Sequence, residues 1–324
     1  MVKKKTKENF IQKAKKVALI VLCIVLGLML FGFIYENISE YIDSKTLTPP
    51  GQIVDVNGHK MHIYCTGENN GKPTVILESG AGGNYYDWYK IQPNIAKYTK
   101  VCSYDRAGIG FSDTTNNKHN NLDVAKELQN LLNAANVPSP YILVGHSLGG
   151  FNIRLYTDKN KTKVAGMVFV DSSVPEMATF KPTFLDKIIY EANIKLLVFS
   201  SYTGLVRLVM TINPNMYAYP TDTRLLLAGI VTPKQFIAGS KEVSDSNINF
   251  EEVRKTNNFG VIPITVLTAK GSADVEPFWK EWQQNLSKIS QNGKQIIVPN
   301  SNHYIHIDQP QVVIDSILEL IPNP

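Results

Sequence analysis

Residues 141–150 read YILVGHSLGG, an apolar run that leads directly into the motif G-x-S-x-G. The apolar run predicts a buried strand, and the motif is typical of a sharp strand-to-helix turn with Ser147 at its tip. A Cβ at Gly145 or Gly149 would clash with neighbouring backbone in such a turn. Because the turn presents the Ser147 hydroxyl as a nucleophile, serine hydrolysis is the leading hypothesis. The motif alone also fits an ordinary glycine-rich turn, so the hypothesis depends on the rest of the chain.

A serine nucleophile needs a histidine base that a carboxylate holds in place, and hydrolases with this turn carry the three in the order Ser, acid, His. Six histidines are present, and only His303 and His306 follow Ser147. They lie between a predicted strand at residues 295–299 and a predicted last helix at residues 309–320. A loop that leaves a strand end is where a base can reach the serine. We therefore assign His303 as the base and keep His306 in reserve.

Two carboxylates compete to orient this histidine. Asp171 ends the predicted strand at residues 166–170, and Asp274 follows the predicted strand at residues 263–269. The residues alone leave both assignments open. The aspartate that is not catalytic is expected to be a simple turn or cap residue at the end of its strand.

The oxyanion of a tetrahedral intermediate needs backbone N–H groups that already point to the place where charge develops. One donor comes from the residue after the nucleophile, which is Leu148 in this chain. The second is expected from the loop after the third core strand, where residues 79–83 read SGAGG. Ala81 lies at the centre of this loop and is the second predicted donor. Its glycine neighbours would let the loop approach a substrate closely.

Several segments in the same order resemble the α/β-hydrolase superfamily, and the resemblance extends from about Gly51 to the C-terminus apart from one insertion. Residues 79–82 are similar to the oxyanion loop of the superfamily, with Ser79 where many members have His. Residues 104–113, YDRAGIGFSD, resemble the turn and loop after the fourth strand. Residues 303–310 resemble the histidine loop.

The resemblance implies a serine enzyme. Ser147 argues against the members that use an aspartate nucleophile, the haloalkane dehalogenases and epoxide hydrolases. Esterase, lipase, thioesterase, peptidase or cofactor-free peroxidase chemistry remains. Members usually carry the acid after the later strand, which corresponds to Asp274, and some carry it at the position of Asp171.

Short apolar runs alternate with longer helix-like segments, which indicates a mostly parallel sheet covered by helices on both faces. The predicted strands lie near residues 61–65, 74–78, 101–104, 141–144, 164–170, 263–268 and 295–298. With the resemblance, this pattern predicts an α/β-hydrolase core at residues 51–176 and 261–324. Residues 177–260 show little strand pattern and predict a mainly helical cap inserted before the penultimate strand. Most of its apolar residues are expected to pack the cap, and their number favours a lipophilic substrate.

A separate segment precedes the predicted core. Residues 1–16 carry seven lysines, and residues 17–35 form an uncharged apolar run. As a helix this run would extend about 28 Å, close to the hydrocarbon thickness of a bilayer. The lysines predict a cytoplasmic tail, a single-pass anchor in the cell membrane and an extracellular catalytic domain. A cleaved signal peptide is the alternative, but its apolar region would be shorter and no small-x-small pattern follows Tyr35. Residues 36–50 are predicted to be a short stalk.

The charge balance argues against a nucleic-acid partner. The chain has 33 basic and 28 acidic residues, and the N-terminal lysines account for the excess, so the predicted core is near neutral. No spacing among cysteines, histidines and carboxylates is typical of a metal site. If the strand order of the superfamily holds, Cys65 and Cys102 lie on neighbouring strands, as a disulfide or as two buried thiols.

These observations predict a membrane-anchored serine hydrolase that cleaves an ester through an acyl-enzyme, without a metal or cofactor. The substrate is expected to be a small apolar ester, as for carboxylesterases and lipases. A peptidase similar to the proline iminopeptidases is the alternative enzyme, because that group resembles this chain in motifs and cap position. A binding module that has lost catalysis is a third hypothesis, which the presence of both Ser147 and His303 disfavours.

Overall fold

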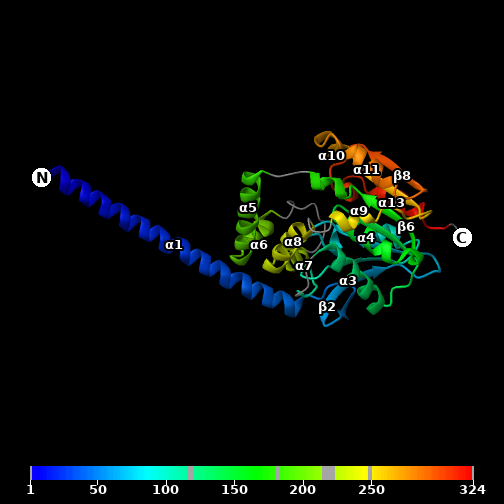
Figure 1. The fold of residues 1–324 in the computed structure, drawn as a ribbon. Helices are drawn as coiled ribbons and strands as arrows, with labels where there is room; N and C mark the ends of the chain where they lie inside the picture. The colour runs from blue at the N-terminus through cyan, green and yellow to red at the C-terminus, as the bar shows by residue number, and fades with distance from the viewer. Residues whose placement is uncertain (1, 116–119, 180–182, 214–222, 247–249, 323–324) are drawn as a thin grey trace. The chain divides into compact units, whose positions relative to one another are not determined.

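The predicted apolar runs are confirmed as strands of one sheet. The computed structural model describes residues 2–115, 120–179, 183–213, 223–246 and 250–322 (Figure 1). The strands are β1 (Gln52–Val56), β2 (His59–Thr66), β3 (Thr74–Glu78), β4 (Val101–Tyr104), β5 (Tyr141–His146), β6 (Val164–Val170), β7 (Ile264–Ala269) and β8 (Gly293–Val298). Their order in this eight-stranded sheet is β1-β2-β4-β3-β5-β6-β7-β8. β2 pairs antiparallel with β1 and β4, and all other pairs are parallel.

Helices cover both faces of the sheet, as predicted. Leu143 of β5 joins one buried apolar cluster with Leu128 and Phe151 from two helices, whereas Val144 joins a second cluster with Val313 from another helix. Because neighbouring residues of a strand point to opposite faces, the two clusters lie on opposite sides of the sheet. The helices of this region are α2 (Gln92–Ile95), α3 (Asn121–Ala134), α4 (Gly149–Lys159), α8 (Pro233–Ser246), α9 (Phe250–Lys255), α10 (Lys270–Val275), α11 (Trp279–Ser287), α12 (Ile305–Asp308) and α13 (Pro310–Leu318), with 3₁₀ turns at Tyr85–Trp88, Lys161–Lys163 and Pro175–Thr179.

Strand β1 was not among the predicted strands. It lies at the edge of the sheet, and four of its five residues are exposed or half-buried, so its sequence has no continuous apolar run. The turn that joins it to β2 has Asn57 and Gly58 at φ values of 55° and 91°. This Asn-Gly pair is a strong hairpin signal and could have identified the strand.

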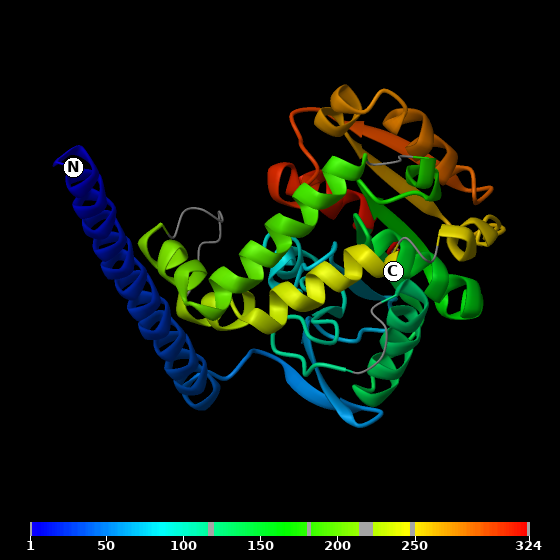
Figure 2. The same ribbon diagram turned by 60° about the vertical axis from the view of Figure 1, so that its left-hand side comes forward.

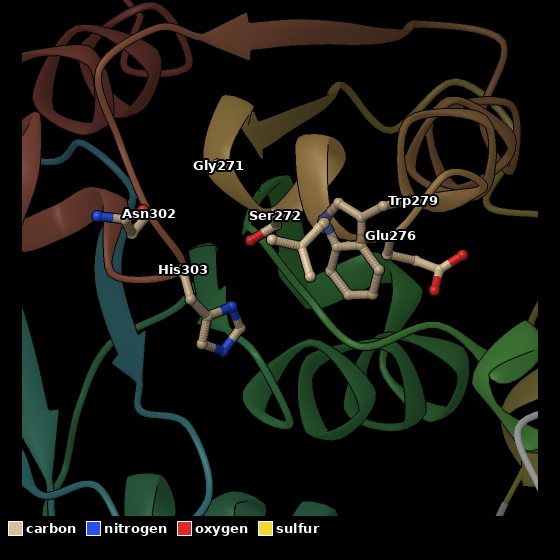
Figure 3. A pocket seen from close by; sticks show the side chains of 7 residues that line it. Gly271, Ser272, Glu276, Trp279, Asn302 and His303 are labelled. Atoms are coloured by element: carbon tan, nitrogen blue, oxygen red, sulfur yellow. The ribbon is translucent and has the colours of Figure 1, made fainter.

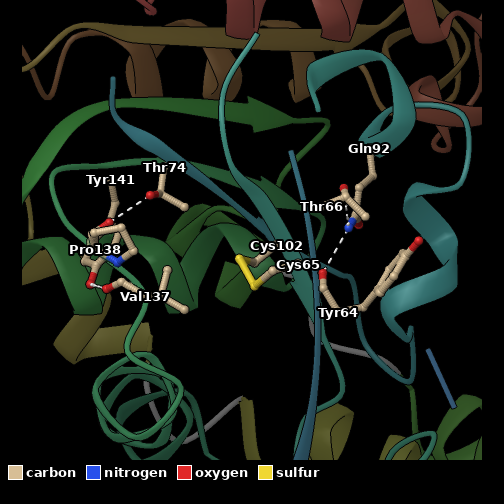
Figure 4. The surroundings of a disulfide bond; sticks show 9 residues. All are labelled: Tyr64, Cys65, Thr66, Thr74, Gln92, Cys102, Val137, Pro138 and Tyr141. Atoms are coloured by element: carbon tan, nitrogen blue, oxygen red, sulfur yellow. Dashed lines mark hydrogen bonds between the residues drawn. A yellow bond between two sulfur atoms is a disulfide. The ribbon is translucent and has the colours of Figure 1, made fainter. Parts of the chain in front are cut away.

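Cys65 and Cys102 form a disulfide between β2 and β4 (Figure 4). The two residues lie directly opposite each other in the antiparallel register. Beside them, the Gln92 amide donates a hydrogen bond to the backbone carbonyl of Tyr64 at 2.9 Å. The alternative that the sequence left open is therefore resolved in favour of the disulfide.

The chain divides into two compact units. One unit holds the sheet and comprises Pro49–Ile189 with Lys234–Pro324, and the other comprises Met1–Thr48 with Tyr190–Pro233. In the second unit, α1 (Val2–Thr46) is one long helix whose apolar run is exposed. It is long and apolar enough to cross a membrane. The predicted stalk continues this helix as far as Thr46.

The predicted cap at residues 177–260 is mainly helical where it is described, and residues 180–182, 214–222 and 247–249 lie outside the described part. Besides α8 and α9 it contains α5 (Phe184–Tyr202), α6 (Leu205–Ile212) and α7 (Thr223–Ile230). These helices follow β6 and precede β7 along the chain (Figure 2). The insertion before the penultimate strand is therefore confirmed.

Candidate active site

Ser147 lies in a tight turn between β5 and α4. Its φ of 50° is in the left-handed region, which L-residues adopt only under constraint. A Cβ on Gly145 would lie 2.9 Å from the backbone of Gly149, and a Cβ on Gly149 would lie 2.6 Å from the carbonyl oxygen of Glu78. Both glycines are thus required by close backbone contacts. The N–H of Ser147 donates to the carbonyl of Val170, which ties the turn to the end of β6.

His303 donates from Nδ1 to the carboxylate of Asp171 at 2.8 Å. Asp171 is fully buried, and its two oxygens accept three further hydrogen bonds, from Ser272 Oγ at 2.6 Å, Trp279 Nε1 at 2.7 Å and Ala269 N at 2.9 Å. A carboxylate can only accept, so His303 carries its proton on Nδ1 and keeps Nε2 free to take one. Four donors, one of which is His303 itself, therefore hold the Asp171 carboxylate in place beside the imidazole.

Asp274, the other candidate acid, lies in a different environment. It is in α10, its side chain is 60% exposed, and it forms an ion pair with Lys270 one helical turn away. Within the described residues no hydrogen bond joins it to His303. The sequence could not separate the two aspartates, because the strand ends that carry them look alike in sequence.

His146 connects the serine turn to the histidine loop. Its Nε2 lies 3.0 Å from the carbonyl oxygen of His303, and its ring centroid is 4.5 Å from that of His306. Burial lowers the pKa of His146 well below its ordinary value, and it lowers the pKa of His306 to about 3. Both rings are therefore neutral at pH 7. His306, the reserve base, is 1% exposed and packs on Trp88 with centroids 4.8 Å apart.

The predicted oxyanion loop lies beside the serine turn. A Cβ on Gly80 would come within 3.1 Å of Ser147 Cβ and 2.9 Å of His146 Nδ1, so the two segments are in contact. Ala81 follows in this loop and is exposed. Leu148 begins the turn into α4 and is buried. Among the described residues neither Ala81 N–H nor Leu148 N–H has a hydrogen-bond acceptor.

A buried arginine that the sequence did not single out supports this loop. Arg106 donates to the carbonyl oxygens of Ser79 at 2.9 Å and Gly80 at 2.6 Å. Its guanidinium also pairs with the carboxylates of Glu78 and Glu242 at 2.7 Å and 2.6 Å. Because the fork geometry of Arg satisfies all of these acceptors together, it fixes the loop rigidly. Arg106 stands in the stretch YDRAGIGFSD, whereas Glu242 is far away in sequence and carries no local signal.

A pocket of about 360 Å³ opens beside the imidazole (Figure 3). Figure 3 shows the His303 ring, the Ser272 hydroxyl and the Trp279 indole among the side chains that line it. Three of the four donors to Asp171, namely Ser272, Trp279 and His303, thus line the pocket. The complete lining is Gly271, Ser272, Val275, Glu276, Trp279, Asn302 and His303.

Comparison with known proteins agrees with this fold. The sequence profile of the family described as alpha/beta hydrolase fold matches residues 73–196. The uncharacterized protein YqjL of Bacillus subtilis is 26% identical over 245 residues, which cover 74% of this chain and 80% of that protein. The structure of a thermophilic esterase from Thermogutta terrifontis matches with a TM-score of 0.59 at 16% identity, covering 84% of this chain and 97% of the esterase. The epoxide hydrolase CorEH matches with a TM-score of 0.55 at 18% identity, covering 83% and 97%.

The chain therefore has the α/β-hydrolase fold, and the resemblance seen in its sequence is confirmed. Its structural neighbours include an esterase and an epoxide hydrolase, two enzymes with different reactions. The fold alone does not choose between such reactions, and the residues of the site must do so.

Proposed function

We propose that this protein is a serine hydrolase that cleaves carboxylic esters, with Ser147 as nucleophile, His303 as base and Asp171 as the acid of the triad. The observation that carries the proposal is the hydrogen bond between His303 Nδ1 and the buried carboxylate of Asp171, in a chain whose Ser147 occupies a strained turn. Asp274 is not part of the proposed triad, because it is exposed and paired with Lys270.

In the proposed reaction, His303 Nε2 takes the hydroxyl proton of Ser147 as the serine oxygen attacks the ester carbonyl carbon. The backbone N–H groups of Ala81 and Leu148 stabilise the negative oxygen of the tetrahedral intermediate. The imidazolium then returns its proton to the departing alcohol, which leaves an acyl-enzyme. A water molecule, deprotonated by the same histidine, attacks the acyl group and releases the acid. Asp171 keeps the imidazole in the correct tautomer throughout.

A serine at the tip of the turn favours acyl transfer over epoxide opening. An epoxide hydrolase of this fold uses a carboxylate as its nucleophile, whereas residue 147 of this chain is a serine with a hydroxyl group. Val275 and Trp279 line the pocket beside His303, which supports an ester with an apolar part.

We further propose that α1 anchors the protein in the cell membrane, with residues 1–16 in the cytoplasm and the catalytic unit outside. Seven lysines precede the apolar run, which supports this orientation. The disulfide between Cys65 and Cys102 is compatible with an oxidising extracellular location.

A substrate panel tests the reaction class. The full-length protein in detergent is given nitrophenyl esters of short and long acyl chains and, separately, aminoacyl-naphthylamides, with Ser147→Ala as the control. We expect hydrolysis of the esters that disappears in the control. Cleavage of the naphthylamides but not of the esters would replace the proposal with a peptidase similar to the proline iminopeptidases.

A further inference from the structure

Helix α6 exposes its apolar side chains and buries its charged one. Leu205, Leu208 and Ile212 are 50%, 49% and 74% exposed, and their spacing places them on one face of the helix. Arg207 and Met210 lie on the opposite face and are 5% and 7% exposed. A helix on the surface of a water-soluble protein has the reverse arrangement. The outward face of α6 therefore indicates a neighbour that is not water.

Helix α5 carries one row of charged side chains and exposes apolar side chains around much of its remaining surface. Lys187, Glu191 and Lys195 follow one another at four-residue intervals and form a charged row. Ile189 and Leu196 project from the other side and are 51% and 62% exposed. A charged row on an otherwise apolar helix is suited to the membrane interface, whereas a spanning helix is apolar all round. The pair α5 and α6 is bent by 81°, and its joint length and hydropathy are in the range of membrane segments.

A buried ion cluster attaches α6 to α1. Arg207 donates from Nε at 2.9 Å and from Nη2 at 2.8 Å to the carboxylate of Glu36, and from Nη1 at 2.8 Å to Asp43. Glu36 and Asp43 are seven residues apart on α1 and hence share one face of that helix. Their exposed fractions are only 2% and 7%. Such charge-assisted contacts fix the position of α6 on α1.

A close backbone contact gives the level of this attachment along α1. A Cβ on Gly32 would lie 2.2 Å from the carbonyl oxygen of Thr203, in the link between α5 and α6. Gly32 precedes Tyr35, the last residue of the apolar run, by three residues, which is about 4.5 Å along the helix axis. Interfacial helices are buried about 5–10 Å into the boundary between head groups and acyl chains. The link therefore lies at interfacial depth when α1 spans a bilayer.

We propose that the apolar faces of α5 and α6 lie in the outer leaflet of the bilayer that α1 crosses, so that the lipid surface is their partner. The attachment to α1 beside the end of its apolar run favours lipid over a second copy of the chain as the occupant. The proposal rests on the anchor role proposed above for α1. It adds a second membrane-bound element, which the sequence analysis did not predict.

The experiment measures the depth of single fluorophores in the full-length protein reconstituted into phosphatidylcholine vesicles. One sample carries an environment-sensitive label on Cys23, the free and exposed thiol of α1. Two others carry it at Leu208→Cys and at Phe278→Cys, both in a Cys23→Ser background. Phe278 is an equally apolar, 58% exposed residue of the unit that holds the sheet and is the matched control. For each sample we compare the fluorescence quenching by three agents. These are a nitroxide lipid with the quencher near the head group, a nitroxide lipid with the quencher deep in the acyl chain, and aqueous iodide.

We expect the label at position 208 to lose most of its fluorescence to the shallow nitroxide lipid and little to iodide, and the label at position 278 to behave in the opposite way. Strong quenching at 208 by iodide would overturn the proposal. Quenching of the 208 label mainly by the deep nitroxide would also overturn it, because α5 and α6 would then span the bilayer. Quenching by neither agent would overturn it as well, because protein would then cover this face. The Cys23 label tests the anchor separately, since it is quenched by the deep nitroxide only if α1 crosses the bilayer.

Discussion

Replacing Asp171 by Asn gives the sharpest test of how the imidazole is held. Oδ1 of Asp171 accepts from Trp279 Nε1 and Ala269 N, whereas Oδ2 faces His303 Nδ1 and Ser272 Oγ. In Asp171→Asn the amide oxygen is expected to stay with the two N–H donors, because an NH₂ group there would meet only donors. The NH₂ group then faces His303 and donates to its Nδ1.

This reversal changes the tautomer of His303. With Nδ1 accepting, the proton of the neutral imidazole is on Nε2, and the ring cannot take the proton of Ser147. The same change in the serine-protease triad costs about 10⁴-fold in kcat. We expect a similar loss here, which corresponds to about 5.4 kcal/mol of transition-state stabilisation at 1.36 kcal/mol per tenfold. Asp274→Asn is the matched control and removes only an exposed ion pair.

The assay is kcat/KM for hydrolysis of a nitrophenyl ester by the two full-length variants in detergent, with thermal unfolding to show that both are folded. The reasoning predicts the large loss in Asp171→Asn and a rate near that of the wild type in Asp274→Asn. A folded Asp171→Asn protein with near wild-type activity, or a loss in Asp274→Asn as large as that expected for Asp171→Asn, would refute it.

Three further predictions follow from the geometry. Gly149→Ala would place a Cβ 2.6 Å from the carbonyl oxygen that ends β3, so we expect its ester hydrolysis to be lost; wild-type kinetics would contradict the geometry of the turn. Arg207→Met leaves two buried carboxylates without a counter-charge. We expect this change to lower the unfolding free energy of the unit that contains α1 by about 3–5 kcal/mol and to expose α5 and α6 to cleavage by chymotrypsin. The control Arg254→Met, at an exposed pair, should cost no more than about 1 kcal/mol, and equal effects of the two changes would count against the cluster. The pKa of His306 is about 3 in the folded protein, below its ordinary value of 6.5. Between these two pH values the unfolded chain therefore binds more protons than the folded protein. The folded state consequently loses stability as the pH drops below 6.5. Thermal unfolding from pH 7 to pH 4 should show this slope, to which His306 contributes up to about 1.4 kcal/mol per pH unit and the buried His146 adds in the same direction. An unchanged slope in His306→Asn would exclude His306 as a source.

Much of the fold was predictable because short segments of the sequence determine its strands and turns. A parallel strand covered on both faces, such as β5, must be apolar along its length, and the turn after it must have glycine where backbone approaches closely. The edge strand β1 lacks a continuous apolar run, and only the Asn57-Gly58 turn after it indicates a strand there. The long helix α1 was visible as an apolar run, but its continuation to Thr46 was not, since residues 36–50 mix polar and apolar residues and end in two prolines.

The sequence named candidate residues for the site but could not show which of them lie together in space. Chain order and strand ends indicated His303 and two aspartates, yet the choice between Asp171 and Asp274 depends on which carboxylate reaches the imidazole in space. The same limit applies to Arg106 and Glu242, which are 136 residues apart and meet only in the folded chain. Arg207 is a further example, because a charge in an apolar helix gives no sign of the partner that neutralises it.

If Ser147 is an activated nucleophile, it reacts with a fluorophosphonate probe. The full-length protein in detergent is labelled, digested and analysed by mass spectrometry, with Ser147→Ala and His303→Ala treated in parallel. We expect a single labelled peptide that contains Ser147, no label in Ser147→Ala and strongly reduced label in His303→Ala. A folded wild-type protein that takes up no label, or one labelled at another residue, would show that Ser147 is not the nucleophile and would favour a binding module built on a hydrolase fold.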